Sequence, residues 1–391
     1  MKQKLVRITT VPMSLNKLLE GQLEFMNQHF NVIAISSKDK ELRRVGKKEN
    51  VKTYCVEMTR QITPLKDLHS LIRLYFFLLK EKPEIVHTHT PKAGLLGMIA
   101  AFLAGVPIRL HTVAGLPLLE TQGIKRQLLD RIEKLTYRLA TRIYPNSYEL
   151  KKIILTNEFI SEKRLKVLGN GSSNGIDTNF FNRNKISEKH LVKLKHQFGI
   201  QEADFVFIFV GRLVKDKGIN ELVDAFNKLN QKYKFTKLLL VGPFEPILDP
   251  LSIETIQKIE KNTSIIHTGY QEDVRPFYAM SDVLTFPSYR EGFPNVVLQA
   301  GAMDLPSIVT DINGCNEIIT SGFNGEIIPK KDQDALYDMM KAYLKNKELY
   351  CRVRSNTRKE IVKKYERSEF LEILLNEYKS LTKEFILYQN S

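Results

Sequence analysis

The chain of 391 residues has no tryptophan, only three cysteines and no long apolar run. The cysteines are far apart and odd in number, which argues against a disulfide framework and against a zinc site. The most apolar windows, at 68–79 and 93–104, are much shorter than the roughly 20 residues of a membrane-spanning helix. The amino-terminal residues lack the apolar stretch of a secretory signal. We therefore expect a globular cytoplasmic protein.

Positive charge is concentrated in the first half of the chain. The net charge is +15, and residues 1–180 hold 29 Lys and Arg against 16 Asp and Glu, whereas residues 181–391 hold 30 against 28. Such a basic half can bind nucleic acid, anionic lipid headgroups or a pyrophosphate, or it can be a well-solvated surface. The length favours two domains, and a hydrophobic content of 43% supplies two cores.

Short apolar runs alternate with helical patterns along the whole chain. Strand-like runs lie at 5–10, 32–37, 51–56, 85–90, 108–114 and 142–146, with helical patterns at 16–28, 65–80, 94–104 and 125–140. After a Gly/Ser/Asn-rich stretch at 169–177, strand-like runs return at 205–210, 238–241, 265–268, 282–286, 307–310 and 326–328. Helical patterns follow at 333–346, 347–364 and 368–388. This βαβ rhythm predicts two doubly wound parallel-sheet domains, hinged near residues 169–202.

Ligands of open parallel sheets bind beyond the carboxyl ends of the strands, so the residues directly after strands matter most. The segment 210–218 follows the first strand of the second domain. There Gly211 permits close backbone approach, and Arg212 and Lys217 bring two cations to a helix that begins near Ile219. The segment is neither a Walker loop nor a GxGxxG fingerprint. A diphosphate site and an ordinary strand–helix turn with solvated charges both remain open.

The segment 288–303 follows the strand at 282–286. A helix that begins at Pro294 or Asn295 would direct the N–H groups of Gly292, Phe293 and Asn295 towards an anion. Pro294 has no N–H but suits a first turn. Glu291, just ahead of the helix, either caps it or binds sugar hydroxyls. Gln299 lies about two turns further along.

In this order and spacing, the motifs resemble those of the retaining GT-B glycosyltransferases of family 4 over nearly the whole chain. The matching segments are 211–218, 291–299, 87–94, 111–112, 174–177 and 311–317. Within the family, the chain is similar to the bacterial enzymes that extend lipid-pyrophosphate-linked oligosaccharides for surface polysaccharides. The resemblance implies two Rossmann-like domains facing across a cleft. Residues 1–175 would bind the acceptor, completed by the carboxyl-terminal helix 368–391, and residues 176–367 would bind the donor.

The resemblance also implies roles for individual residues. Arg212 and Lys217 would bind the donor diphosphate, Glu291 would contact the transferred sugar, and His111 would meet that sugar near its reacting carbon. Without the resemblance, a histidine satisfied inside the sheet edge would be the better interpretation of His111. Further donor contacts are expected from Gly211, Gly292, Phe293, Pro294, Asn295, Gln299, Tyr270 and Ser14, and weak acceptor contacts from His89 and Lys92. No metal or other cofactor is expected, because fixed cations neutralise the diphosphate.

The sequence departs from the family pattern at two positions. Gln299 stands where the family has a Glu that accepts hydrogen bonds from ribose hydroxyls, so we expect a contact without charge assistance. The first loop, with Ser14, lacks the Gly-Gly pair of many members.

Three other features are compatible with ordinary structural roles. Asp332-Gln-Asp334 has the form of a metal-binding DxD but suits a helix N-terminus. His87 and His89 face one side of a strand without a visible third ligand. The apolar stripe of 65–80, formed by Leu68, Leu71, Ile72, Tyr75, Leu78 and Leu79, is interpreted as a buried face. The basic helices at 125–131 and 134–142 are the better candidates for lipid headgroups.

The expected activity is transfer of a hexose or N-acetylhexosamine, with retention, from a nucleotide-sugar to a lipid-pyrophosphate-linked saccharide. UDP is the preferred nucleotide by resemblance, and the basic first domain would place the enzyme on the inner face of the cell membrane. Two alternatives remain: a nucleotide-sugar 2-epimerase of the same fold, and a basic nucleic-acid-binding protein. The second lacks a recognisable reading motif.

Overall fold

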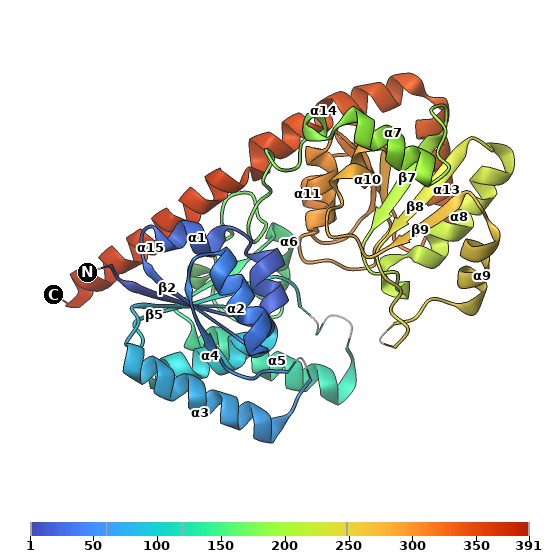
Figure 1. Ribbon diagram of the computed structural model, residues 1–391. Coiled ribbons are helices and arrows are strands. Elements are labelled where there is room, and N and C mark those ends of the chain that lie inside the picture. Colours follow the sequence, from blue (N-terminus) through green and yellow to red (C-terminus); the bar gives the residue numbers. More distant parts are fainter. Residues whose placement is uncertain (1, 60, 117, 119–120, 248, 390–391) are drawn as a thin grey trace. The chain divides into compact units, whose positions relative to one another are not determined.

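The computed structural model of the chain describes residues 2–59, 61–116, 118, 121–247 and 249–389, with side chains as far as residue 387. The chain divides into two compact units (Figure 1). Unit 1 comprises Met1–Asn174 and Ser368–Ser391, and unit 2 comprises Gly175–Arg367. The last two residues of the helical segment expected at 368–391 lie outside the described residues.

Unit 1 contains a six-stranded, all-parallel sheet in the order β3-β2-β1-β4-β5-β6. Its strands are β1 (Lys4–Ile8), β2 (Asn31–Ser36), β3 (Lys52–Cys55), β4 (Ile85–His89), β5 (Ile108–Val113) and β6 (Arg142–Pro145). Its helices are η1 (Ser14–Leu18), α1 (Gln22–Asn27), α2 (Asp39–Lys48), α3 (Pro64–Glu81), α4 (Pro91–Leu103), α5 (Gly123–Leu139), α6 (Tyr148–Thr156), η3 (Glu162–Arg164) and α15 (Arg367–Gln389) without its first residue.

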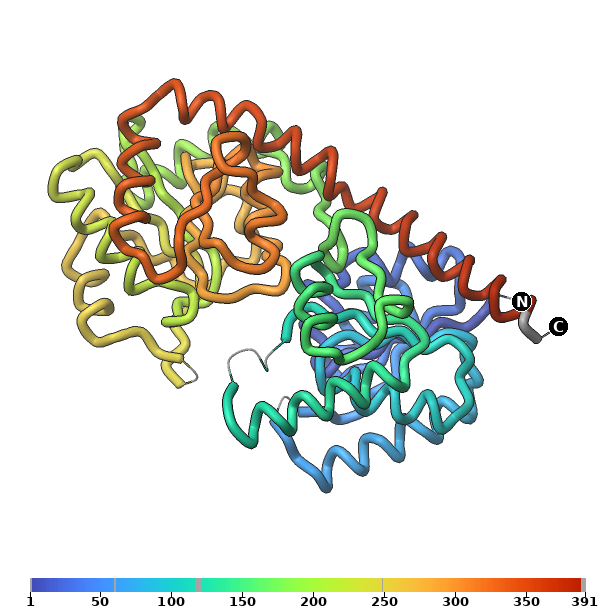
Figure 2. The backbone as a smooth tube through the Cα atoms, turned by 180° about the vertical axis from the view of Figure 1, so that it is seen from behind, coloured from blue at the N-terminus to red at the C-terminus, as the bar shows by residue number. Residues whose placement is uncertain are grey.

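The strands of unit 1 are apolar on both faces because helices cover both sides of the sheet. Leu5 of β1 belongs to one core, whereas Val6 and Ile8 of the same strand belong to the other, as the period of two requires. The first core contains side chains of η1, α1, α2 and α15. The second contains side chains of α3, α4, α5 and α6. The helices α3, α4 and α5 lie side by side in one layer, as both backbone views show (Figures 1 and 2).

Unit 2 repeats this strand order. Its sheet is also all-parallel, in the order β12-β11-β10-β7-β8-β9, which is the order of unit 1 when β7 is counted as the first strand. The strands are β7 (Phe205–Val210), β8 (Thr236–Val241), β9 (Ile265–Gly269), β10 (Val283–Phe286), β11 (Ser307–Thr310) and β12 (Gly325–Ile328). The helices are η4 (Arg183–Lys185), α7 (Glu188–Gln197), η5 (Lys215–Lys217), α8 (Ile219–Lys232), α9 (Ile253–Lys261), α10 (Arg275–Ala279), α11 (Asn295–Ala302), α12 (Cys315–Ile318), α13 (Gln333–Lys345) and α14 (Lys347–Tyr365).

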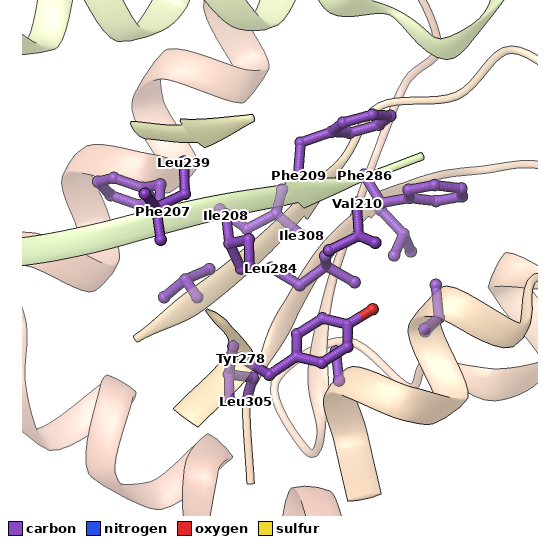
Figure 3. Close-up of a cluster of buried hydrophobic side chains, with 14 of the residues drawn as sticks. Phe207, Ile208, Phe209, Val210, Leu239, Tyr278, Leu284, Phe286, Leu305 and Ile308 are labelled. Carbon is purple, nitrogen blue, oxygen red and sulfur yellow. The ribbon is translucent and has the colours of Figure 1, made fainter. Parts of the chain in front are cut away.

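A single cluster of buried apolar side chains holds unit 2 together. Phe207 and Phe209 of β7, Phe286 of β10 and Tyr278 of α10 all belong to this cluster (Figure 3). The rings of Phe209 and Phe286 are stacked with their centroids 5.8 Å apart. This packing fixes the two central strands, whose carboxyl ends carry the segments 210–218 and 287–295.

Three expectations about local structure are corrected. Residues 188–197, expected within the hinge, form α7 of unit 2. The helix expected at 16–28 is divided into η1 and α1, since Gly21 has a left-handed conformation with φ of 73°. The stripe on α3 is not a single buried face: Leu78 is buried, but Leu68 and Ile72 are 54% and 46% exposed. Leu79 is 37% exposed as well.

Candidate functional site

The switch point of the sheet in unit 2 lies between β7 and β10. These two strands are neighbours, and the chain leaves β7 towards β8 on one side and β10 towards β11 on the other. The segments that follow them therefore meet at the carboxyl edge, where sheets of this kind bind ligands. The structure thus brings together the two segments that the sequence singled out.

Lys217 and Glu291 contact each other at this carboxyl edge of the sheet. The ammonium group of Lys217, in η5, donates to Oε1 of Glu291, and the hydroxyl group of Ser288 donates to the same oxygen at 2.9 Å. The two charged side chains are only 19% and 16% exposed. Glu291 does not cap the next helix, because α11 begins at Asn295 without a side-chain cap. The carboxylate group of Glu291 is instead held beyond the carboxyl end of β10 by Lys217 and Ser288.

The backbone just after Glu291 offers unused donors. The N–H groups of Gly292, Phe293 and Asn295 donate to no other residue within the described part of the chain. They directly precede or begin α11, where N–H groups lack intrahelical acceptors. Pro294 occupies the N-cap position, one residue earlier than the first turn expected for it.

Asn313, which sequence reasoning missed, ties the Glu291 segment to the segment after β11. Its side-chain NH2 group donates to the carbonyl oxygens of Glu291 at 3.0 Å and Gly292 at 2.8 Å. The next residue, Gly314, has φ of 78°, and a Cβ atom there would lie 2.5 Å from the carbonyl oxygen of Gly292. The partners are more than twenty residues apart in sequence, so no local motif indicates this contact.

Asp216, also missed, connects the two segments at the switch point. Its carbonyl oxygen accepts from the N–H of Tyr289 at 2.8 Å, and its carboxylate accepts from the guanidinium group of Arg290 at 2.9 Å. Gly211 follows β7, and its N–H donates to Val241 at 2.9 Å. Arg212 is more open: its side chain is 54% exposed and lies 3.9 Å from Glu245.

Gln299 has a partner of its own inside unit 2. The hydroxyl group of the buried Tyr278 lies 3.3 Å from Oε1 of Gln299 and 3.4 Å from the carbonyl oxygen of Val296. Figure 3 shows the ring of Tyr278 within the apolar cluster with its hydroxyl group at the margin. Tyr270 follows β9 directly and is 66% exposed, which leaves its ring accessible.

In unit 1, His111 lies within β5 and is 3% exposed. Its Nδ1 is 2.8 Å from the hydroxyl oxygen of Thr88 in β4. Burial lowers the pKa of His111 to about 4, so the imidazole is neutral at physiological pH. Ser14 begins η1 after β1, beside the switch point of this sheet between β1 and β4.

The two residues from which weak acceptor contacts are expected both have partners within unit 1. His89 is 1% exposed, its Nε2 lies 2.8 Å from the guanidinium group of the buried Arg7, and its Nδ1 has no hydrogen-bond partner among the described residues. The ammonium group of Lys92 forms a partly buried salt bridge with Asp67 at 2.6 Å, which fixes the start of α3 against α4.

Neither candidate metal motif has the geometry of a metal site. Asp332 is the N-cap of α13 and accepts from the N–H of Ala335 at 2.9 Å, and Asp334 pairs with Lys228 at 2.7 Å. The rings of His87 and His89 lie on the same face of β4, as expected. However, each ring nitrogen of His87 is within hydrogen-bond distance of a hydroxyl group. Among the described residues, no three His, Cys, Asp or Glu side chains are grouped so that they could hold a metal ion.

Comparison with known proteins finds glycosyl transferases for both halves of the chain. Residues 25–171 match the family model of the glycosyl transferase 4-like domain, and residues 193–360 match that of glycosyl transferases group 1. The chain is 34% identical over 385 residues to the capsular polysaccharide biosynthesis glycosyltransferase CapM of Staphylococcus aureus, with 98% of each chain covered.

A second relative and a solved structure extend this result. The chain is 32% identical over 291 residues, 72% of each chain, to the UDP-Gal:alpha-D-GlcNAc-diphosphoundecaprenol alpha-1,3-galactosyltransferase of Escherichia coli. Its fold is similar to that of Anabaena HepE, solved in complex with UDP and glucose. The TM-score is 0.81 at 17% identity, and the match covers 97% of this chain and 100% of that one.

Proposed function

The chain belongs to the group 1 glycosyl transferases of GT-B fold, and we propose that it moves a hexose or N-acetylhexosamine to a saccharide carried on a lipid diphosphate. The observation that carries the proposal is the Lys217–Glu291 pair beside three N–H groups that donate to no other described residue. Cations and N–H groups at a strand edge suit a diphosphate, and a carboxylate suits sugar hydroxyls. The Escherichia coli relative is named for a diphosphoundecaprenol acceptor, which supports the proposed acceptor class.

We infer that the donor is a UDP-sugar and that transfer proceeds with retention. The bond between the anomeric carbon and the diphosphate oxygen breaks, and its electron pair leaves with UDP. The acceptor oxygen bonds to the carbon on the same face, and its proton passes to the departing phosphate. Arg212, Lys217 and the N–H groups of the Gly292 segment would stabilise the developing negative charge, so the reaction would not require a metal.

The remaining site residues would orient the donor. Glu291 would accept hydrogen bonds from the transferred sugar, and His111 of unit 1 would contact the same sugar. Gln299 would contact the ribose. Its Oε1 accepts from Tyr278 and keeps a further lone pair, and its NH2 group adds donors, so the amide would meet the ribose hydroxyls without charge assistance. Tyr270, Gly211 and Ser14 would complete the donor contacts.

A surface on unit 1 supports docking on an anionic membrane. On α5, Ile124, Leu128 and Leu135 are exposed at 87%, 47% and 44% and lie on one helical stripe. Exposed cations flank this stripe, namely Lys125, Arg131, Lys134 and Arg138. A helix with this pattern lies in the headgroup region, with its apolar side chains among the lipid chains.

The neighbouring helix α3 carries a longer apolar stripe on its outer surface. Its five side chains are 37% to 85% exposed: Leu65, Leu68, Ile72, Phe76 and Leu79. Because α3, α4 and α5 form one layer, the outer sides of α3 and α5 belong to the same face of unit 1 (Figure 2). We call this surface, formed by the eight named apolar residues of α3 and α5, the α3/α5 face.

The carboxyl groups of α3 and α5 are either paired with cations or buried. Asp67 pairs with Lys92 at 2.6 Å, Glu81 with Lys4 at 2.9 Å and Asp130 with Arg126 at 2.7 Å. The fourth carboxyl group, that of Glu133, is buried. The α3/α5 face therefore carries cations without competing anions from its own helices, which complements anionic lipid headgroups. None of the helices in the described part of the chain is long and apolar enough to span a bilayer.

The test of the proposed reaction is nucleotide release from a panel of UDP- and GDP-sugars, with EDTA, in the presence and absence of lipid-diphosphate-linked saccharides. The wild type is compared with Lys217→Ala and Glu291→Ala. Lys258→Ala is a matched control, because Lys258 of α9 forms comparable pairs with Asp224 of α8 and with Glu254 of its own helix. We expect acceptor-dependent release from one UDP-sugar, reduced at least about a hundredfold in the two site variants only.

Other outcomes decide against specific parts of the proposal. Release that EDTA abolishes would contradict the metal-independent mechanism. Conversion of the donor without any acceptor would identify a nucleotide-sugar epimerase instead. Inversion of the anomeric configuration in the product, measured by the proton coupling at the anomeric carbon, would contradict retention.

A further inference from the structure

The side chains of Thr88 and His111 face each other across neighbouring strands of unit 1. The two residues are direct partners in the pairing of β4 with β5, and both are buried, with exposures of 0% and 3%. The distance from Thr88 Oγ1 to His111 Nδ1 is 2.8 Å, that of a full hydrogen bond. The other ring nitrogen, Nε2, has no hydrogen-bond partner among the described residues.

Helix α4 holds this pair in place. A Cβ atom on Gly94 would lie 2.5 Å from Cε1 of the His111 ring, so the ring rests directly against the helix backbone. A Cβ atom on Gly97, one turn later, would lie 2.6 Å from the methyl group of Thr88. The ring of Tyr137 lies on another side, with its centroid 6.1 Å from that of His111. The imidazole therefore has little freedom to turn away from Thr88.

The Thr88 hydroxyl group has a second acceptor within reach besides the imidazole ring. Its single proton has a carbonyl acceptor, that of Leu110, 3.4 Å away. When the hydroxyl donates to this carbonyl, its lone pairs face Nδ1 of His111, and Nδ1 must carry the imidazole proton to complete the contact. Because the ring is neutral, Nε2 then keeps a lone pair and acts as an acceptor.

We propose that Thr88 is a positioning residue that holds His111 in the Nδ1–H tautomer, so that Nε2 accepts a hydrogen bond from a hydroxyl group of the transferred sugar. The part concerning the sugar rests on the proposed function. The assignment of the tautomer rests only on the contacts around Thr88, so the two parts can fail separately.

The first experiment measures the tautomer in the full-length wild-type protein. Nitrogen-15 NMR of protein labelled at its eight histidines distinguishes a protonated from an unprotonated ring nitrogen, and a His111→Asn variant assigns the signal. We expect a protonated Nδ1 and an unprotonated Nε2 at pH 7.5. A protonated Nε2 in the wild type would overturn the proposal, whatever the activity of the enzyme.

The second experiment compares Thr88→Val, which keeps the shape of the side chain without the hydroxyl group, with Thr88→Ser, which keeps the hydroxyl group. We expect Thr88→Val to shift the tautomer and to lower kcat for transfer about tenfold to a hundredfold, with the Kd for UDP unchanged. Thr88→Ser should restore the tautomer and most of kcat. Thr136→Val is the control for loss of a buried hydroxyl group, since Thr136 bonds within α5 at 2.9 Å.

Equal losses in Thr88→Val and Thr88→Ser, with an unchanged tautomer, would assign Thr88 to packing alone and overturn the proposal. If Thr88→Val does not fold, the wild-type tautomer and the kcat of Thr88→Ser still decide it. A wild type with the expected tautomer but without transferase activity would refute the proposed function and leave the structural assignment standing.

Discussion

The hydroxyl group of Tyr278 donates to Oε1 of Gln299 across 3.3 Å, which joins α10 to α11 beside the switch point of unit 2. The amide oxygen, expected from the sequence to serve the ribose, is thus already engaged within the protein. A carboxylate at the same position would keep the Tyr278 contact through one oxygen and leave a second, charged oxygen for a ligand.

Gln299→Glu should therefore strengthen donor binding. We expect a KM for the donor that is lower by about threefold to tenfold, with kcat little changed, since the ribose contact is equal in the ground and transition states. Steady-state kinetics and calorimetric titration with UDP measure this change. Glu254→Gln, on the exposed start of α9, is a control for altered charge. An unchanged Kd for UDP would show that residue 299 does not contact the ribose.

Asn313→Asp should disrupt the Glu291 segment without unfolding unit 2. The substitution replaces a donor by a carboxylate that faces two carbonyl oxygens, so these would repel it and the segment would shift. We expect kcat/KM to fall about tenfold to a hundredfold with a small change in Tm. Asn316→Asp alters the same short segment at a side chain that bonds only to Asp311 at 3.0 Å, and it should stay near wild-type activity. Similar losses in both variants would refute a specific role for Asn313.

Gly314→Ala and Gly322→Ala distinguish the effect of a clash with Gly292 from the effect of a strained backbone conformation. Both glycines have positive φ, 78° and 76°, so both alanine variants should lose about 1 kcal/mol of stability. Only the new Cβ atom at residue 314 would collide with Gly292, whereas the one at residue 322 has no heavy atom within 4 Å. We expect Gly314→Ala to lose further stability and to lose donor binding, measured by titration with UDP, and Gly322→Ala to keep the UDP affinity of the wild type. Equal UDP affinity in the two variants would contradict the expected displacement.

Much of the fold could be predicted because parallel strands covered on both faces are continuous apolar runs. Lys217 and Glu291 were found because each follows such a run, and neighbouring strands bring their carboxyl ends together. The orientation of α3 could not be predicted, since Leu74 and Leu78 on its inner side and Leu68 and Ile72 on its outer side are equally apolar. Asn313 and Tyr278 were missed because their partners come from other elements, and only tertiary packing brings them into contact.

The α3/α5 face makes a prediction about membrane binding. Leu68→Asp with Phe76→Asp should reduce binding to vesicles that contain phosphatidylglycerol by at least about tenfold, because two apolar side chains are lost from the interface. Lys125→Glu with Arg131→Glu should reduce binding to anionic vesicles most strongly at low salt. Sedimentation with vesicles measures both effects. Ile253→Asp, at a 77% exposed position of unit 2, is the matched control. Equal losses in the control and the α3 variant would refute the assignment of this face.

Glu133 makes a prediction about stability and pH. Burial raises the pKa of its carboxyl group to about 7, from an ordinary value of 4.5. Between these two values the folded protein binds more protons than the unfolded chain, so this group's contribution to stability falls as the pH rises from 4.5 through 7. At pH 8.5 the folded protein must hold a buried charge, at a cost of up to about 3 kcal/mol.

Glu133→Gln removes this cost while keeping the size of the side chain. We expect its Tm to exceed that of the wild type at pH 8.5 and the difference to shrink or reverse at pH 5, measured by calorimetry in matched buffers. Glu149→Gln, on helix α6 at a less buried position, is the control for loss of a carboxylate. The buried histidines, with lowered pKa values, act in the opposite direction below pH 6.5 in both proteins, so they cancel in the comparison. A constant difference in Tm from pH 5 to pH 8.5 would mean that Glu133 does not titrate in this range.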